Sequence, residues 1–140
     1  KLYTAIKGKG AFCEGKEIYA SKTSSIQNSL MVTGFGYEHG ENWEKNMGLF
    51  RHFTDITQGV RRLGAAAIDM CHVACGKADA YWEYDIKPWD IGAGILIAKE
   101  AGCVVSDFTG KNTDMYTDNI LLTNEALHSE MVKEIKDHLN

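Results

Sequence analysis

Short apolar runs alternate with helical patterns along the whole chain. Residues 2–6 alternate apolar and polar side chains, which is typical of a half-buried strand, and the compact apolar run at 29–33 predicts a buried strand. The expected strands span residues 2–6, 11–14, 29–33, 55–60, 78–83, 104–105 and 120–123, and the expected helices span 41–52, 65–75, 91–101 and 125–139. Because strands and helices alternate, the pattern predicts a layered α/β domain rather than a helical bundle or a β-sandwich.

One folding unit accounts for all 140 residues. No internal repeat, low-complexity tract or interdomain linker interrupts the pattern, so we expect a single domain over residues 1–140. With 44% hydrophobic and 10% aromatic residues, a chain of this length can bury a substantial core.

The charge balance and the chain start exclude several classes of protein. A net charge of -4 gives no sign of a nucleic-acid binder, although it is compatible with binding small anions through a metal. No apolar run is long enough to span a membrane, and the first residues lack the features of a signal peptide. Because the chain does not begin with methionine, we expect a fragment or a processed piece. The scattered cysteines predict free thiols in a reducing, intracellular compartment rather than a disulfide framework or a zinc site.

The strongest candidate site lies between the strand at 78–83 and the helix that follows it. Glu83 stands at the strand end and Asp90 at the expected helix start, seven positions later, with a loop stiffened by Pro88 between them. Since ligands of α/β sheets collect beyond the carboxyl ends of strands, we expect both carboxylates to face one cleft.

Asp90 has two interpretations. Aspartate is a preferred N-cap, and capping the helix at 91–101 would by itself explain this residue. A carboxylate in the same place is also a hard oxygen ligand suited to Mg²⁺.

Other candidates flank these two carboxylates. Gly64, Ala65 and Ala66 begin an alanine-rich helix, whose free amides suit an anion or a polyhydroxy ligand, although tight helix packing is the commoner reason for such small residues. Arg61 and Arg62 could steer a phosphate or be solvated. Further expectations are that Asp79 and Asp85 are solvated, that His72 is a core histidine, and that Gly8-Lys9-Gly10 is a turn rather than a phosphate-binding loop.

As a set, these segments resemble the inositol monophosphatase family. Residues 89–94, Trp-Asp-Ile-Gly-Ala-Gly, followed by Glu-Ala-Gly at 100–102, are similar to the family's second signature. Residues 8–12 and 59–67 are similar to further family segments in the same order, so the resemblance covers nearly the whole chain. Residues 32–39, 81–83 and 87–89 look closest to the cyanobacterial and plant plastid branch.

This resemblance implies the C-terminal half of a layered αβαβα phosphatase with a mixed sheet and helices on both faces. It implies magnesium-dependent hydrolysis of inositol monophosphate, in which metal ions activate water for in-line displacement. Asp90 corresponds to the family's catalytic metal ligand, which also touches the substrate, and Glu83 to its inositol-binding glutamate. Gly64, Ala65 and Ala66 correspond to residues that line the substrate. The expected partner is a small phosphorylated polyol, with no nucleic acid and no membrane. The longer protein is expected to be a homodimer, to which Tyr37 and Trp43, both expected to be exposed, could contribute. The expected compartment is a plastid or a bacterial cytoplasm.

Two departures from the family pattern stand out. Cys103 replaces a second glycine after Glu-Ala-Gly, which we expect to be tolerated. The family's first signature, Asp-Pro-x-Asp-Gly-Thr, does not occur in these residues, although it supplies most of the metal ligands. We therefore expect the chain to be inactive alone. Rival hypotheses are a phosphatase for another small ester, such as a sugar bisphosphate, histidinol phosphate or a nucleotide phosphate, and a non-catalytic binding module.

Overall fold

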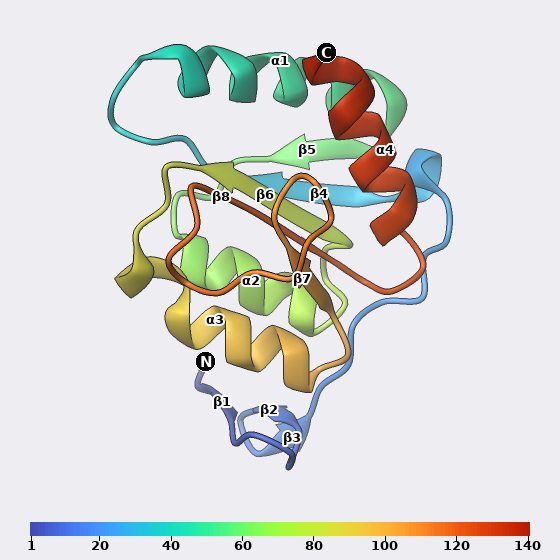
Figure 1. The fold of residues 1–140 in the computed structure, drawn as a ribbon. Coiled ribbons are helices and arrows are strands. Elements are labelled where there is room, and N and C mark those ends of the chain that lie inside the picture. Colours follow the sequence, from blue (N-terminus) through green and yellow to red (C-terminus); the bar gives the residue numbers. More distant parts are fainter.

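A five-stranded mixed sheet forms the centre of the structure, a computed structural model that describes residues 1–140 (Figure 1). The strands are β1 (Tyr3–Ala5), β2 (Ala11–Cys13), β3 (Lys16–Glu17), β4 (Leu30–Thr33), β5 (Gly59–Arg61), β6 (Ala80–Tyr84), β7 (Val104–Ser106) and β8 (Asn119–Thr123). The helices are α1 (Glu41–Ile56), α2 (Ala66–Ala74), α3 (Pro88–Glu100) and α4 (His128–Leu139), with a short 3-10 turn at Ile26–Asn28. The central sheet has the order β5-β4-β6-β8-β7, and β1, β2 and β3 form a separate antiparallel sheet.

Three neighbouring parallel strands determine where a ligand site can form. β4 lies between β5 and β6 and runs parallel to both, whereas β8 runs antiparallel to β6 and β7. α1 connects β4 to β5, and α2 then leads from β5 past β4 to β6, so the two connections cross the sheet in opposite directions. Crossovers of one hand then place α1 and α2 on opposite faces, as Figure 1 shows. The carboxyl ends of all three strands meet at one edge.

Helices cover both faces of the central sheet, as expected from the sequence. α2 and α3 pack on one face with the β1–β3 sheet beyond them, and α1 and α4 pack on the other (Figure 1). A hydrophobic core lies on each face of the sheet, and β8 contributes to both. Leu122 faces α2 and α3, while its neighbour Leu121 faces α1 and α4. Side chains of a strand point alternately to the two faces of its sheet, so a strand covered on both faces requires apolar residues at consecutive positions.

Most expected elements are confirmed, and their boundaries differ by three or four residues at three places. The strand expected at 55–60 is wrong in its first half, because α1 continues to Ile56 and the strand is only Gly59–Arg61. Ile56 packs against the same core as Phe53 and so prolongs the apolar face of α1. α3 begins at Pro88 rather than Ile91, since proline is well suited to the first helical position. α4 begins at His128 rather than Glu125, because the Asn124 side chain accepts the Leu127 N–H at 2.9 Å and forms a separate turn.

The turn expected at Gly8-Lys9-Gly10 is confirmed, and the end of α3 holds it in place. The Glu100 carboxylate accepts the N–H groups of Gly8 and Gly10, both at 2.9 Å. These bonds hold the pKa of Glu100 below its usual range, and they show that the glutamate of Glu-Ala-Gly fastens the turn between β1 and β2 to the end of α3. No helix of the structure combines the length and the apolarity that crossing a bilayer requires.

Asp79 is not solvated, contrary to the expectation. Its side chain is buried at the start of β6, where it accepts the N–H of Leu30 at 2.7 Å and the hydroxyl of Ser21. Asp79 therefore ties the beginning of β4 to the beginning of β6, at the edge of the sheet away from the carboxyl ends.

Candidate active site

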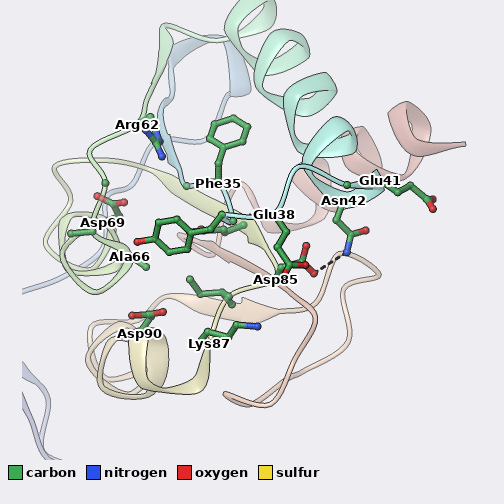
Figure 2. Close-up of a pocket in the computed structure, with 18 residues that line it drawn as sticks. Phe35, Glu38, Glu41, Asn42, Arg62, Ala66, Asp69, Asp85, Lys87 and Asp90 are labelled. Carbon is green, nitrogen blue, oxygen red and sulfur yellow. Dashed lines mark hydrogen bonds between the residues drawn. The ribbon is translucent and has the colours of Figure 1, made fainter.

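A pocket of about 650 Å³ lies at the carboxyl ends of the three parallel strands (Figure 2). Its walls come from residues between 34 and 42, which follow β4, between 62 and 66, which follow β5, and between 85 and 90, which follow β6. Glu83 from β6 and Asp69 from α2 complete it. Its place follows from the topology, since one edge of the sheet carries the ends of β4, β5 and β6.

The predicted site residues all line this one pocket: Gly64, Ala65, Ala66, Glu83 and Asp90. The capping interpretation of Asp90 is wrong, because the N-cap of α3 is Lys87, and no side chain caps this helix. Asp90 is instead an exposed residue of the first turn, where a negative charge suits the helix dipole. Its carboxylate is free to meet a ligand.

Glu83 is fixed in place by its own strand and by the turn after β4. Its side chain is 6% exposed, and the Tyr81 hydroxyl, two residues earlier on the same face of β6, donates to Oε2. A Cβ atom on Gly34 would overlap the Glu83 carboxylate, so the glycine allows this carboxylate to keep its position. Burial raises the pKa of Glu83 to about 7, the Tyr81 hydrogen bond opposes this rise, and the negative charges of Asp69 and Asp90 add to it.

The start of α2 offers backbone groups to a ligand. Ala65 is its N-cap and makes no side-chain hydrogen bond to the helix, so the N–H groups of Ala66 and Ala67 have no acceptor within the helix. Gly64 has φ +90°, a conformation that favours glycine, and it turns the chain from β5 into the helix. The small side chains of Ala65 and Ala66 leave these donors open toward the pocket.

The two arginines before α2 separate. Arg62 lines the pocket, and its guanidinium lies 5.8 Å from the centre of the Phe35 ring. Arg61 turns back to its own strand and donates to the carbonyl of Val60. Lys87, which sequence reasoning missed, supplies the second cation of the pocket.

Sequence reasoning also missed or misplaced other residues around the pocket. Asp85 is exposed as expected, yet it lines the pocket, has φ +56° and accepts a hydrogen bond from Asn42 at 2.9 Å, which Figure 2 shows as a dashed line. Trp43 is half-buried rather than exposed, because its ring stacks on His39 with the centroids 4.5 Å apart, whereas Tyr37 is fully exposed. The role of Tyr81 could have been found from its spacing of two from Glu83 on one strand.

The glycine of the Trp-Asp-x-x-x-Gly segment serves packing. A Cβ atom on Gly94 would lie 2.7 Å from the sulfur of Met70, so Gly94 lets α3 approach α2 closely. Since these helices carry Asp90 and the amides after Ala65, their close contact sets the distance between the two halves of the site.

Charge in the pocket is strongly unbalanced toward carboxylates. Six acidic residues, Glu38, Glu41, Asp69, Glu83, Asp85 and Asp90, stand against the two cations Arg62 and Lys87. A phosphate dianion would be repelled unless a further cation neutralised part of this charge. Residues 1–140 do not form a complete metal site, since no three His, Cys, Asp or Glu side chains are grouped closely enough to hold an ion. Asp90 can supply one oxygen ligand, and Mg²⁺ requires several.

The comparisons with known proteins agree with this geometry. The model of the inositol monophosphatase family matches residues 1–140. The chain belongs to this family. It is 48% identical over 135 residues to the chloroplastic phosphatase IMPL1 of Arabidopsis thaliana and 44% identical over 131 residues to the inositol-1-monophosphatase of Synechocystis. These matches cover 96% and 94% of the chain, but only 36% and 46% of the two relatives.

The solved structure of the inositol monophosphatase from Anabaena superimposes with a TM-score of 0.93 at 40% identity, covering 97% of this chain and 56% of that protein. The fold expected from the resemblance is therefore confirmed, and so is the cyanobacterial and plastid branch, since a chloroplast protein and two cyanobacterial ones stand at 40% identity or more. The chain spans about half the length of the family members that it matches.

Proposed function

We propose that residues 1–140 supply the C-terminal part of a phosphoric monoester hydrolase that converts inositol monophosphate to inositol and phosphate with Mg²⁺. One observation carries this proposal: Asp90, Glu83 and the uncapped start of α2 line a single pocket at the carboxyl ends of three strands. These groups offer a metal ligand, a hydroxyl acceptor and anion-binding amides in one place.

Each part of the pocket has a role in this proposal. Asp90 is the catalytic carboxylate and metal ligand, and it also touches the substrate. Glu83 accepts hydrogen bonds from the ring hydroxyls, while Gly64, Ala65 and Ala66 line the substrate. The excess of carboxylates over cations supports a requirement for metal ions, and the remaining metal ligands would come from outside residues 1–140.

The carboxylates of Asp69, Glu83 and Asp90, which form an acidic floor of the pocket, also favour a polyol monophosphate over a bisphosphate. Glu83 is buried and near Asp69 and Asp90, whose charges act on it. The negative charge of a second phosphate at this place would be repelled by these carboxylates, and the buried surroundings screen that repulsion poorly. A hydroxyl would instead find hydrogen-bond acceptors. A panel of inositol monophosphate, a sugar bisphosphate, histidinol phosphate and a nucleotide phosphate tests this preference. The rival substrate classes gain if any of them is hydrolysed faster.

Phosphate release tests the proposed activity. The natural gene product that contains residues 1–140 should release phosphate from inositol monophosphate with Mg²⁺ and lose this activity in excess chelator. Asp90→Asn should lower kcat by about 100-fold or more, since it removes a charged group that acts on the transition state. Asp55→Asn, an exposed residue of α1 outside the pocket, is the matched control and should leave the rate unchanged. Normal activity of Asp90→Asn would contradict the proposal.

A non-catalytic role is the competing outcome. A relative in Pseudomonas aeruginosa, 35% identical over 98% of this chain, bears the name Nus factor SuhB rather than the name of a phosphatase. If the natural gene product binds inositol monophosphate but releases no phosphate with any divalent metal, the chain is a binding module.

We also propose a homodimer and a location in a plastid or a bacterial cytoplasm. The fully exposed Tyr37 supports a contact near the pocket rim, and the chloroplast and cyanobacterial relatives support the location. Sedimentation of the natural gene product and of its Tyr37→Ser variant tests the homodimer. Cell fractionation tests the location.

A further inference from the structure

Asp69 differs from the other buried acidic residues of the chain. Its side chain is 1% exposed, and neither carboxylate oxygen has a hydrogen-bond partner. Asp79 and Glu83 are also buried, but both accept hydrogen bonds from neighbouring residues. Asp69 lines the pocket, and in the view of Figure 2 it lies on the same side as Asp90, opposite Glu38 and Asp85.

An unpartnered carboxylate in this position is unfavourable for the isolated fold. A buried carboxylate without donors loses its hydration, and burial accordingly raises the pKa of Asp69 to about 6. Its two oxygens can accept about four hydrogen bonds, and no group within residues 1–140 uses them. Buried groups of this kind persist where a ligand supplies the missing partners.

The surroundings of Asp69 determine which ligand can do so. The negative charges of Asp69 and Asp90 both act on Glu83, so this floor of the pocket contains three neighbouring carboxylates. An anion would be repelled there, and residues 1–140 by themselves group no three carboxylates closely enough to hold a metal ion. A neutral molecule with several hydroxyl groups can donate to the free oxygens without adding negative charge.

We infer that Asp69 is a specificity-determining residue that accepts hydrogen bonds from a hydroxyl of the bound polyol, alongside Glu83. Asp69 approaches from α2 and Glu83 from β6, so the two acceptors hold the ring from two elements whose positions the core fixes. This inference rests on the proposed function, since it concerns the polyol part of that substrate.

Binding of myo-inositol, followed by NMR titration of the natural gene product, tests the inference separately from catalysis. Asp69→Leu keeps the branched shape of the side chain, although it is larger, and has no acceptors, so it should weaken binding by about 10- to 100-fold. Asp69→Asn, which has nearly the same volume as aspartate and keeps one acceptor, should fall between this variant and the wild type. Asp55→Leu on the exposed face of α1 is the control and should bind as the wild type does. Unchanged binding by Asp69→Leu would overturn the inference.

Hydrolysis gives a second readout. Asp69→Leu should raise KM for inositol monophosphate about 10- to 100-fold. The KM for p-nitrophenyl phosphate, which has no hydroxyls, should change by about twofold at most. The unfolding midpoint of Asp69→Asn should rise or stay the same, because an unpartnered buried carboxylate is replaced by a neutral group of nearly the same volume. Equal losses with both substrates, or a clear fall of the midpoint, would assign Asp69 a structural role. If the wild type binds inositol but releases no phosphate, the proposed function fails and the inference stands.

Discussion

At the scale of single residues, Glu83 shows how a strand can place a charged group beneath a pocket. Tyr81 donates to it along one face of β6, and Gly34 leaves room for it from the neighbouring strand end. The carboxylate is nevertheless largely removed from water, which raises its pKa to about 7. Its ionisation is therefore linked to folding, because the unfolded chain would release this proton at a lower pH.

This linkage predicts how stability depends on pH. Below about pH 4.5, Glu83 is protonated in both states and its burial is not penalised. As pH rises toward 7, the unfolded chain ionises first, so the contribution of this residue to the free energy of unfolding falls, by up to about 3 kcal/mol. Glu83→Gln lacks the titration and should gain stability relative to the wild type between pH 5 and pH 8.

Chemical denaturation of both proteins across this pH range measures the difference. Carboxylates without an electrostatic interaction with Glu83 titrate equally in the two proteins and cancel in the comparison, whereas Asp69 and Asp90 are coupled to Glu83. A constant difference from pH 5 to pH 8 would mean that Glu83 has an ordinary pKa in the folded state.

At the scale of secondary-structure elements, Asn46 connects α1 to the strands that form the site. Its side-chain amide donates to the Gly34 carbonyl at 2.6 Å, and its oxygen accepts the indole N–H of Trp82 at 2.8 Å. The residue is buried, so both partners depend on it. α1, which packs on the face of the sheet opposite α2 and α3, thus fixes the position of the turn after β4.

Asn46→Ala should therefore lower the free energy of unfolding by about 2–4 kcal/mol, since a buried carbonyl and a buried indole lose their partners. Asn42→Ala, one turn earlier on α1, is the matched control, because it loses only an exposed bond to Asp85 and should cost about 0.5 kcal/mol or less. Equilibrium denaturation followed by tryptophan fluorescence measures both. Equal stability of the two variants would contradict this role of Asn46.

At the scale of the whole molecule, the central sheet joins two cores into one unit. Leu121 and Leu122 are adjacent and fully buried, yet they belong to cores on opposite faces. Neither core can be lost without exposing one face of the same strands.

Leu121→Ala and Leu122→Ala should each lower the free energy of unfolding by about 2–5 kcal/mol while keeping a single transition. Circular dichroism and tryptophan fluorescence should report the same midpoint for each variant. Leu63→Ala, at an exposed position, is the control. Separate transitions by the two probes would show that the two faces unfold independently.

Much of this architecture was predictable from local pattern. The compact run before Gly34, the alanine-rich helix and the amphipathic last helix carry their own periodicity, so their type followed from the sequence, as did the family from residues 89–94 and 100–102. The end of α1 and the first residue of α3 were misjudged, because the packing of Ile56 and the suitability of Pro88 for a first turn outweigh the local pattern.

The chemical groups available to the site follow from the amino-acid sequence alone: Glu83, Asp90 and the small residues at the start of α2. The tertiary structure brings them into one pocket, because that depends on β4, β5 and β6 ending at one edge of the sheet. It also decided that Asp90 is not a cap, that Asp79 is buried, and that Asp69 faces the pocket without partners. Burial and hydrogen bonding of a carboxylate are set by residues distant along the chain, and no local pattern contains them.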